Sequence, residues 1–207
     1  MPEKPPSLRE RQAQLTRDEI LKAARRLFAE RGYTRTSVRD IADAAGVSAQ
    51  TVYDSIGAKQ ALVAQLNDLI DAEAGIVAIA GAAARSDDPA EVAATPARIA
   101  RSILEHCGDI VHALVTGAAA EPELAVALAE GQRRHVEGAG MIVGRLEQMG
   151  ALDGSLGTEG AVDTLAAISD VRVALLLHGS YGWSLDRIET WISAASRALL
   201  LRPSPSP

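Results

Sequence analysis

Two short helices separated by a tight turn are the feature that most constrains this chain. Ser37 carries an acidic residue three positions later, which is the spacing of a capping box, and apolar residues at helical spacing follow until Gly46. Ser48 begins another short helix, which we expect to end at about Tyr53 or Ser55. A short helix, a turn and a second short helix form the pattern of a helix-turn-helix motif.

A longer helix is predicted to precede this motif and to pack against it. Thr16 and Glu19 have capping-box spacing, and Leu15 and Ile20 occupy the positions of a hydrophobic staple. Apolar residues then recur at helical spacing up to Gly32. We therefore expect a three-helix domain over residues 16–60, preceded by a flexible arm over residues 1–15, where Pro, charged residues and Gln show no apolar period.

The third of these helices is predicted to enter a DNA major groove. Val52 is expected to face the domain core, so that its neighbours are left exposed. Gln50 can pair with adenine, while Ala49 or the methyl group of Thr51 can contact a thymine methyl. Other residues near helix starts can bind phosphates and set the register of the complex. These phosphate-binding candidates are Thr36, Ser37, Arg39, Ser48, Tyr53 and Lys59.

The distribution of charge supports a DNA partner for this domain, although the formal net charge of the whole chain is -6. Residues 1–60 contain 11 Lys/Arg and 8 Asp/Glu, whereas residues 61–207 contain 10 and 19. A locally basic surface favours phosphate binding, because the release of counterions supplies much of the sequence-independent affinity. The acidic remainder would repel DNA and confine it to one face.

The same segment resembles the DNA-binding domain of the TetR family of transcriptional repressors. The resemblance covers about residues 16–62 and is carried by residues 16–21, 23–24, 27–33, 36–42, 44–48 and 51–53. The family often continues Tyr-x-His-Phe-x-x-Lys, whereas this chain has Ser55 and Ile56 before Lys59. Ser55 is a weaker phosphate donor than His, and Ile56 keeps only a packing role. We expect Asp54 to face solvent, the alternative being acceptance of a hydrogen bond from a cytosine amino group.

Residues 61–202 are predicted to form a larger helical domain, which makes the chain all-α with about nine helices. No segment has the alternation of a strand. Residues 203–207 are expected to be a disordered, proline-rich tail. The helical segments expected in the larger domain are about 62–79 with a break near Gly75, 98–106 and 110–114, 122–149, 158–178, and 184–201.

The resemblance implies that this larger domain binds a small molecule and forms a dimer. We place the effector pocket near Ile103, Cys107, Ile110, Leu114 and Met141. The last two helices are apolar over a wide arc, so we place a homodimer interface at Leu165, Ile168, Leu176, Trp191 and Ile192; the alternative is that they form the core of a monomeric bundle. An aromatic content of 3% favours an aliphatic or weakly polar effector.

These features predict a sequence-specific transcriptional regulator, a repressor that binds a near-palindromic operator as a dimer and is released by a small-molecule effector. The alternative is an effector-independent DNA-binding protein with the same reader domain. A helical enzyme is the third hypothesis, but His106, Cys107 and His112 do not share a helix face, so we expect no catalytic site, metal or cofactor.

The same composition bears on the compartment. One cysteine in 207 residues predicts a cytoplasmic protein. The N-terminal residues lack the apolar run of an export signal. The apolar run from Ile76 to Ala84 is shorter than the roughly 18 residues that span a bilayer, so no membrane partner is expected.

Overall fold

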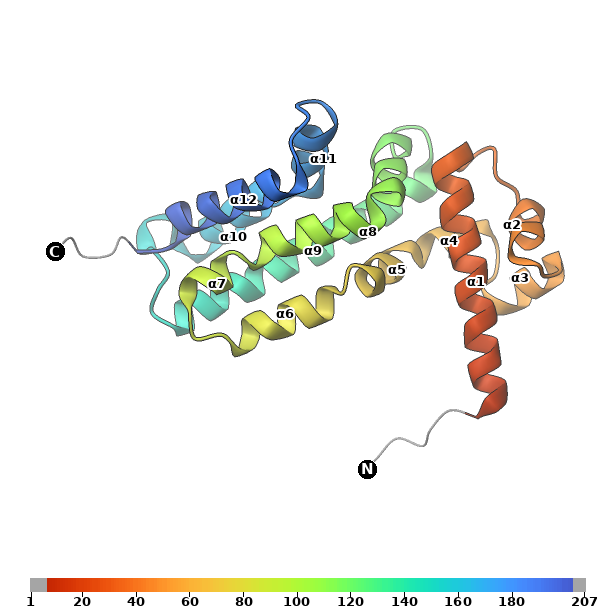
Figure 1. Cartoon of the computed structure of the whole chain (residues 1–207), viewed down its shortest axis with the longest axis horizontal. Coiled ribbons are helices and arrows are strands. Elements are labelled where there is room, and N and C mark those ends of the chain that lie inside the picture. The colour runs from red at the N-terminus through yellow and green to blue at the C-terminus, as the bar shows by residue number, and fades with distance from the viewer. Residues whose placement is uncertain (1–6, 203–207) are drawn as a thin grey trace. The chain divides into compact units, whose positions relative to one another are not determined.

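The computed structural model describes residues 7–202, and within this range the secondary structure is helical (Figure 1). No strand occurs among these residues; Leu152 and Leu201 form an isolated antiparallel bridge. The expected all-α class is therefore confirmed. The elements are α1 (Leu8–Arg31), α2 (Val38–Ala45), α3 (Ala49–Ser55), α4 (Lys59–Ala64), α5 (Leu66–Glu73), α6 (Ile76–Arg85), α7 (Pro89–Ala93), α8 (Thr95–Gly117), α9 (Pro122–Gln148), η1 (Gly154–Leu156), α10 (Gly157–Ile168), α11 (Val171–Gly179) and α12 (Leu185–Leu200).

Short interruptions decide how many helices are counted in the described range. Helices α4, α5 and α6 follow one another with breaks at Gln65 and around Gly75, and only Ala94 separates α7 from α8. Gly75 has a left-handed backbone conformation and no side chain caps α6. If α4–α6 and α7–α8 are each taken as one interrupted helix, nine helices remain, as the sequence predicts.

The chain forms two compact units, and each is described by itself. The first contains the chain up to Leu69 together with His112–Leu128, and the second contains Ile70–Val111 and the chain from Ala129 onward. The first unit thus combines α1–α4 and the start of α5 with the corner at which α8 ends and α9 begins. The predicted disordered tail at residues 203–207 lies outside the described residues.

Helix α1 begins earlier than the sequence analysis predicts. Ser7 Oγ accepts a hydrogen bond from the Glu10 backbone N–H (3.3 Å), and Glu10 Oε2 accepts one from the Ser7 N–H (2.6 Å), which completes a capping box. Thr16 lies inside the helix, where its hydroxyl donates to the Gln12 carbonyl (3.0 Å). The prediction of a flexible arm is therefore wrong for residues 8–15, and residues 1–6 lie outside the described range.

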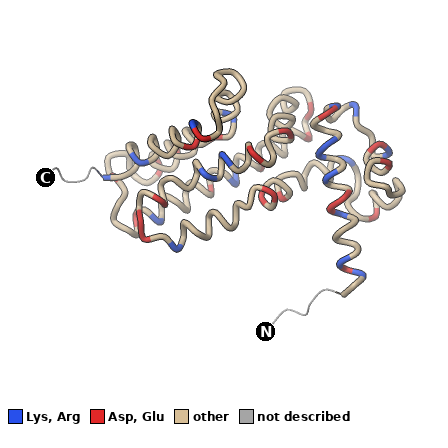
Figure 2. The backbone as a smooth tube through the Cα atoms, viewed as in Figure 1, with Lys and Arg blue, Asp and Glu red and all other residues tan. Residues whose placement is uncertain are grey.

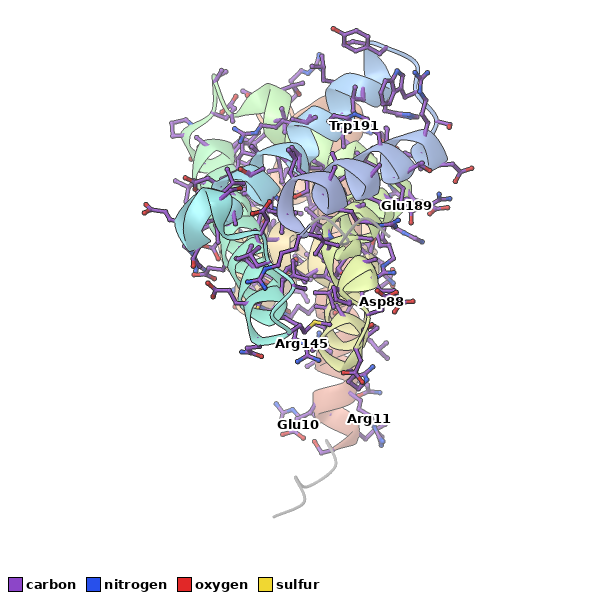
Figure 3. The ribbon with its side chains drawn as sticks, turned by 90° about the vertical axis from the view of Figure 1, so that its left-hand side faces the viewer. Glu10, Arg11, Asp88, Arg145, Glu189 and Trp191 are labelled. Atoms are coloured by element: carbon purple, nitrogen blue, oxygen red, sulfur yellow. The ribbon has the colours of Figure 1, made fainter. Side chains whose placement is uncertain are left out.

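The physical reason for this longer helix is that two capping sequences follow one another. Good helix formers fill the interval between them, without Gly or Pro, so the helix starts at the first. The early turns pack against nothing in the first unit: Leu15 is 64% exposed and is no hydrophobic staple. Figure 3 shows Glu10 and Arg11 projecting from this end of α1.

An apolar core joins α1, α2 and α3. Ile20 and Phe28 of α1, Ile41 of α2 and Val52 of α3 are among the fully buried side chains. Each such residue contributes about 1.5–3 kcal/mol through burial. The Phe28 and Tyr33 rings pack with centroids 5.4 Å apart, which closes the core beside the loop that leads into α2. The three-helix arrangement predicted from the sequence is confirmed.

The second unit has two apolar clusters. The first gathers small and branched residues from α6, α7, α9, α10 and α12, including Val143, Leu146 and Leu165. The second joins α8, α11 and α12 through residues such as Ala174, Ile188 and Ile192. Within residues 7–202, no single helix is both long and apolar enough to cross a membrane; one sharply bent pair, Pro89–Gly117 with Pro122–Gln148, meets the criteria of length and composition when taken together.

The segment predicted as one helix over residues 158–178 is divided into α10 and α11. Asp170 ends the continuity because its Oδ1 accepts a hydrogen bond from the Arg172 backbone N–H (2.8 Å) and so caps α11. Ser169 stands beside it and donates its hydroxyl to the Leu165 carbonyl (2.6 Å). The prediction of a single helix is therefore wrong. The apolar periodicity continues through this segment, but the buried Asp170 side chain starts a new helix.

Candidate DNA-binding surface

The turn between α2 and α3 is held by backbone and side-chain caps. Ser37 Oγ accepts from the Asp40 N–H (3.1 Å) at the start of α2, and Ser48 Oγ accepts from the Thr51 N–H (3.0 Å) at the start of α3. Gly46 adopts a left-handed conformation (φ 68°), and the Val47 N–H donates to the Ala42 carbonyl (3.0 Å). A side chain at Gly46 would disfavour this backbone conformation. These contacts fix α3 against α2.

One face of α3 is buried and the opposite face is open to solvent. Val52 is completely buried, whereas Gln50, Tyr53 and Asp54 are exposed and lie close together around the helix. Half of the Tyr53 side chain is exposed, although its ring is largely apolar. Among the predicted base-reading residues, Gln50 therefore lies on the open face, and Ala49 and Thr51 are half-buried at its edge.

Three of the predicted phosphate ligands lie at exposed helix starts. Ser37 and Ser48 are the N-cap residues of α2 and α3, and Arg39 is exposed in the first turn of α2. The Ser37 side chain and then its backbone N–H hold Asp40 by hydrogen bonds and lower the pKa of that carboxyl group. The helix dipole favours an anion at a helix N-terminus, but at the start of α2 the Asp40 carboxylate already occupies the Ser37 N–H.

Thr36 is not available to a phosphate. Its side chain is 1% exposed, and its hydroxyl donates to the Gly32 carbonyl (2.9 Å) and lies 3.3 Å from the Leu27 carbonyl. The assignment of Thr36 as a phosphate ligand is therefore wrong. The hydroxyl has a local structural function instead: it donates to the carbonyl of Gly32, the residue that caps the C-terminus of α1.

The prediction that Lys59 binds phosphate is also wrong. Its Nζ donates to the Tyr33 carbonyl (2.5 Å) and lies 3.8 Å from the centroid of the Tyr33 ring. Burial lowers the pKa of Lys59, while Glu121 and Glu123 act in the opposite direction. The ammonium group is thus committed to a contact between α4 and the α1–α2 loop, and the proposal that it binds phosphate does not fit this arrangement.

Two contacts of α3 are absent from the sequence analysis. Gln50 Nε2 donates to Asp54 Oδ1 (2.7 Å), so Asp54 does more than face solvent. Arg17 of α1 donates from Nη1 to the Ser55 carbonyl (2.6 Å), which places a cation at the C-terminal end of α3. The spacing of Gln50 and Asp54 is a signal that sequence reasoning could have used. The Arg17 contact joins residues too distant in sequence to be found in that way.

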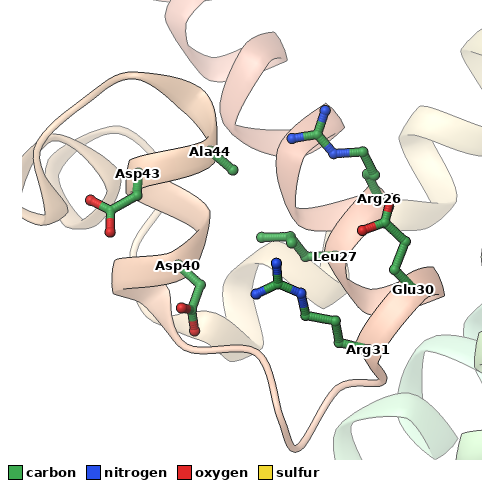
Figure 4. Close-up of a pocket in the computed structure, with 7 residues that line it drawn as sticks. All are labelled: Arg26, Leu27, Glu30, Arg31, Asp40, Asp43 and Ala44. Atoms are coloured by element: carbon green, nitrogen blue, oxygen red, sulfur yellow. The ribbon is translucent and has the colours of Figure 1, made fainter.

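Basic residues are distributed along α1, as Figure 2 shows. This helix contains seven Lys/Arg and four Asp/Glu, whereas α3 contains no basic residue. A hollow of about 560 Å³ lies between α1 and α2, and charges of both signs face one another across it (Figure 4). Its lining residues are Arg26, Leu27, Glu30, Arg31, Asp40, Asp43 and Ala44.

Within the first unit, the α8–α9 corner contacts the α1–α2 loop, α4 and the start of α5. Thr34 donates its hydroxyl to Glu121, and Gln60 Nε2 donates to Glu123 Oε1 (3.5 Å). Asn67 is 6% exposed, and its amide donates to the Ala127 carbonyl (2.8 Å). An unpaired buried amide would be costly, so this last bond fixes α5 against the start of α9.

The candidate effector-pocket residues do not share one environment. Cys107 and Ile110 are buried and Ile103 is half-buried in the second unit, while Leu114 is buried in the first. Met141 is 69% exposed on α9, so its assignment to an internal pocket is wrong. Helical periodicity places Met141 beside buried neighbours in sequence but does not say which way its own side chain points. Among residues 7–202, no cluster of His, Cys, Asp and Glu could hold a metal ion.

The dimer candidates divide into core and surface residues. Leu165 and Ile192 are completely buried within the second unit, so their assignment to a subunit interface is wrong. Ile168 is partly buried against the first cluster. Leu176 and Trp191 are 51% and 38% exposed, and Figure 3 shows Trp191 on α12. Of the dimer candidates, these two leave apolar surface open on α11 and α12, where Leu199 is also exposed.

Comparison with known proteins agrees with this fold and surface. Residues 20–66 match the family model described as bacterial regulatory proteins, tetR family. The repressor KstR2 of Mycolicibacterium smegmatis is 43% identical over 56 residues, which are 27% of this chain and 27% of that relative. The alignment with this relative thus spans about a quarter of its length.

Solved structures extend the likeness of fold to nearly the whole chain. SmeT, the repressor of the Stenotrophomonas maltophilia multidrug efflux pump SmeDEF, has a TM-score of 0.69 at 18% identity, covering 94% of this chain and 99% of its own. A transcriptional regulator from Saccharomonospora viridis, solved with choline, has a TM-score of 0.71 at 18% identity, covering 92% and 100%.

The chain is therefore an all-α protein with an N-terminal helix-turn-helix domain and a larger C-terminal helical part. That N-terminal domain is a DNA-binding domain of the TetR family, and the fold of the chain is TetR-like.

Proposed function

We propose that this protein is a transcriptional repressor that binds a near-palindromic DNA operator as a homodimer and is released by a small molecule. The observation that carries the proposal is the open face of α3, where Gln50 and Tyr53 project from a helix capped by Ser48. A helix of this kind fits a major groove, and the exposed Arg39 side chain and Ser48 hydroxyl suit phosphate contacts. Such a protein would work in the compartment that holds the chromosome, the cytoplasm.

A homodimer would match the symmetry of a near-palindromic operator. Two recognition helices related by a two-fold axis bind half-sites about 34–36 Å apart, which is one turn of DNA. The exposed Leu176 and Trp191 on α11 and α12 support an interface there, since exposed apolar side chains of this size gain by covering one another.

Regulation by a small molecule would act through α8 and α9. Both helices begin or end in the α8–α9 corner, and both continue into the second unit. Within the first unit, the corner contacts the α1–α2 loop, α4 and α5 through Glu121, Glu123 and the carbonyl of Ala127. A ligand lowers operator affinity only if it binds the released state better than the DNA-bound one. The low aromatic content favours an aliphatic or weakly polar ligand over a flat cation.

The decisive experiment is selection of bound duplexes from a random DNA pool at about 150 mM salt, where nonspecific phosphate binding is weakened. We expect enrichment of a near-palindrome with half-sites one turn apart. Gln50→Ala and Tyr53→Ala should weaken binding to the selected duplex at least several-fold, since each removes a side chain from the open face of α3. Gln148→Ala, at an exposed position at the end of α9, is the matched control and should bind as the wild type does.

Enrichment of no sequence, or selection of the same duplex with unchanged affinity by Gln50→Ala and Tyr53→Ala, would count against the proposal. If the palindrome appears and no small molecule in a broad thermal-shift screen changes operator affinity, the effector-independent reading replaces the regulated one. The screen should contain fatty acids and other aliphatic compounds beside aromatic cations, because stabilisation by the cations alone would contradict the proposed class of effector.

The dimer is tested separately by Leu176→Glu, which places a charge on the open apolar part of α11. We expect the variant to sediment as a monomer and to lose operator affinity. Val77→Glu is the matched control: Val77 is 82% exposed on α6, and its replacement should leave the assembly unchanged. A Leu176→Glu protein that stays dimeric would place the interface elsewhere.

A further inference from the structure

Asp54 is the one acidic side chain of α3, and it stands four residues after Gln50 on the open face of that helix. Residues with this spacing are neighbours on a helix surface. The two side chains are joined by a hydrogen bond from Gln50 Nε2 to Asp54 Oδ1 (2.7 Å). Because an ionised carboxylate only accepts hydrogen bonds, it is the nitrogen of the Gln50 amide that must face Asp54, and the oxygen must point away.

This bond restricts what Gln50 can recognise. A free glutamine can turn its amide and present either oxygen or nitrogen to a base. Adenine in the major groove offers an N6 amino donor beside the N7 acceptor, whereas guanine offers two acceptors, O6 and N7. With one N–H held by Asp54, Gln50 retains one N–H and its outward oxygen. That pair matches adenine, and the outward oxygen is repelled by guanine O6.

We infer that Asp54 is a positioning residue that orients the amide of Gln50 and thereby makes it select adenine over guanine. The inference rests on the proposed function, in which α3 reads bases. Asp54 also brings a negative charge to a surface that approaches phosphates, and that charge lowers affinity for every DNA sequence alike. The orienting effect, in contrast, changes the ratio between two sequences. The two effects can therefore be measured apart.

The test compares Asp54→Asn with the wild type on two duplexes, which differ only by A·T or G·C at the base pair that Gln50→Ala identifies. Asparagine has nearly the shape of aspartate but can donate or accept, so it holds the Gln50 amide in either orientation. We expect the A-over-G affinity ratio to fall by on the order of tenfold, within the range that one bidentate base contact supplies. Affinity for unrelated DNA should rise slightly.

Two controls make the result specific. In the Gln50→Ala background, Asp54→Asn should leave the A-over-G ratio unchanged, since Asp54 then has no amide to orient. Asp43→Asn removes another exposed carboxylate from the same domain, on α2, and should alter overall affinity without changing the ratio. Circular dichroism and thermal unfolding confirm that the variants, all at exposed positions, remain folded.

Three results would overturn the inference. An unchanged A-over-G ratio in Asp54→Asn would mean that Asp54 does not orient Gln50. A changed preference at a different base pair, present with or without Gln50, would mean that Asp54 reads a base directly, as an acceptor from cytosine would. If the wild type discriminates between no duplexes at all, the proposed function itself fails, and the inference fails with it.

Discussion

The turn between α2 and α3 and the apolar faces of α11 and α12 both follow helical sequence patterns, but only the turn is specified by the residues next to it. Ser37 caps the start of α2, and the turn itself is stabilised by the left-handed Gly46 and the Ser48 cap; these contacts all join groups within five residues of one another. On α11 and α12, whether an apolar side chain is core or surface depends on helices from elsewhere in the chain. Local chemistry thus specifies the reader, whereas long-range packing decides the rest.

The largest effect should come from the residues that long-range packing makes core. Ile192→Ala removes a completely buried side chain from the cluster of α8, α11 and α12, and we expect a loss of about 2–5 kcal/mol in the free energy of unfolding. Urea denaturation at fixed protein concentration measures it, with Val77→Ala, at a position 82% exposed, as the control. A loss below 1 kcal/mol would show that Ile192 is not a core residue, and would contradict the assignment of these apolar faces to long-range packing.

A smaller effect is expected at Thr36, which separates a structural hydroxyl from a DNA contact. Thr36→Val keeps the shape but removes the hydroxyl that donates to the Gly32 carbonyl, so the free energy of unfolding should fall by about 1–3 kcal/mol. Operator affinity of the folded variant should not change. A variant that is as stable as the wild type but binds DNA poorly would restore the phosphate contact. Thr190→Val, an exposed hydroxyl, is the matched control.

The Ser48 cap of α3 tests whether a local contact stabilises the helix-turn-helix. Ser48→Ala removes the acceptor for the Thr51 N–H and should cost about 1 kcal/mol of stability, measured by thermal or urea unfolding. Ser48→Asn restores a capping side chain without adding charge and should recover that stability. Equal losses in both variants would contradict a capping function for Ser48.

The smallest effect concerns pH and the cap of α11. Burial acts to raise the pKa of Asp170, but hydrogen bonds from the Arg172 side chain and backbone outweigh it, so that the pKa lies below its usual value of 3.8. A lowered carboxyl pKa means that the contribution to stability is present above pH 4 and is lost as pH falls through the folded-state pKa. The effect is small because half of the Arg172 side chain is exposed.

Asp170→Asn tests this pH dependence directly. Unfolding midpoints measured between pH 7 and pH 2 should show the variant less stable at neutral pH, with a difference that shrinks toward pH 2. A difference that stays constant with pH would show that the charge of Asp170 does not contribute.

The features that the sequence predicts correctly are those that depend on local contacts, and the features that it misses depend on long-range packing. The all-α class, the helix-turn-helix and the open face with Gln50 and Tyr53 follow from periodicity, caps and one left-handed glycine. The start of α1 is predicted too late, because Thr16 has the spacing of a capping box but the helix begins at the earlier one, at Ser7. Thr36 and Lys59 have the chemistry of phosphate ligands, and only their contacts with Gly32 and Tyr33 show that they are engaged inside the unit. Leu165 and Met141 differ in burial for reasons that their helices alone do not contain.

The α8–α9 corner also bears on whether this reader is a portable module. The first compact unit needs residues 112–128 in addition to the N-terminal segment, and Asn67 relies on a carbonyl of that distant stretch for its partner. Grafting the first 60 residues onto another effector domain would leave behind the partners of Thr34 and Gln60 as well. A working chimera would have to be spliced after residue 69 and carry the corner with it, as two exchanged pieces instead of one.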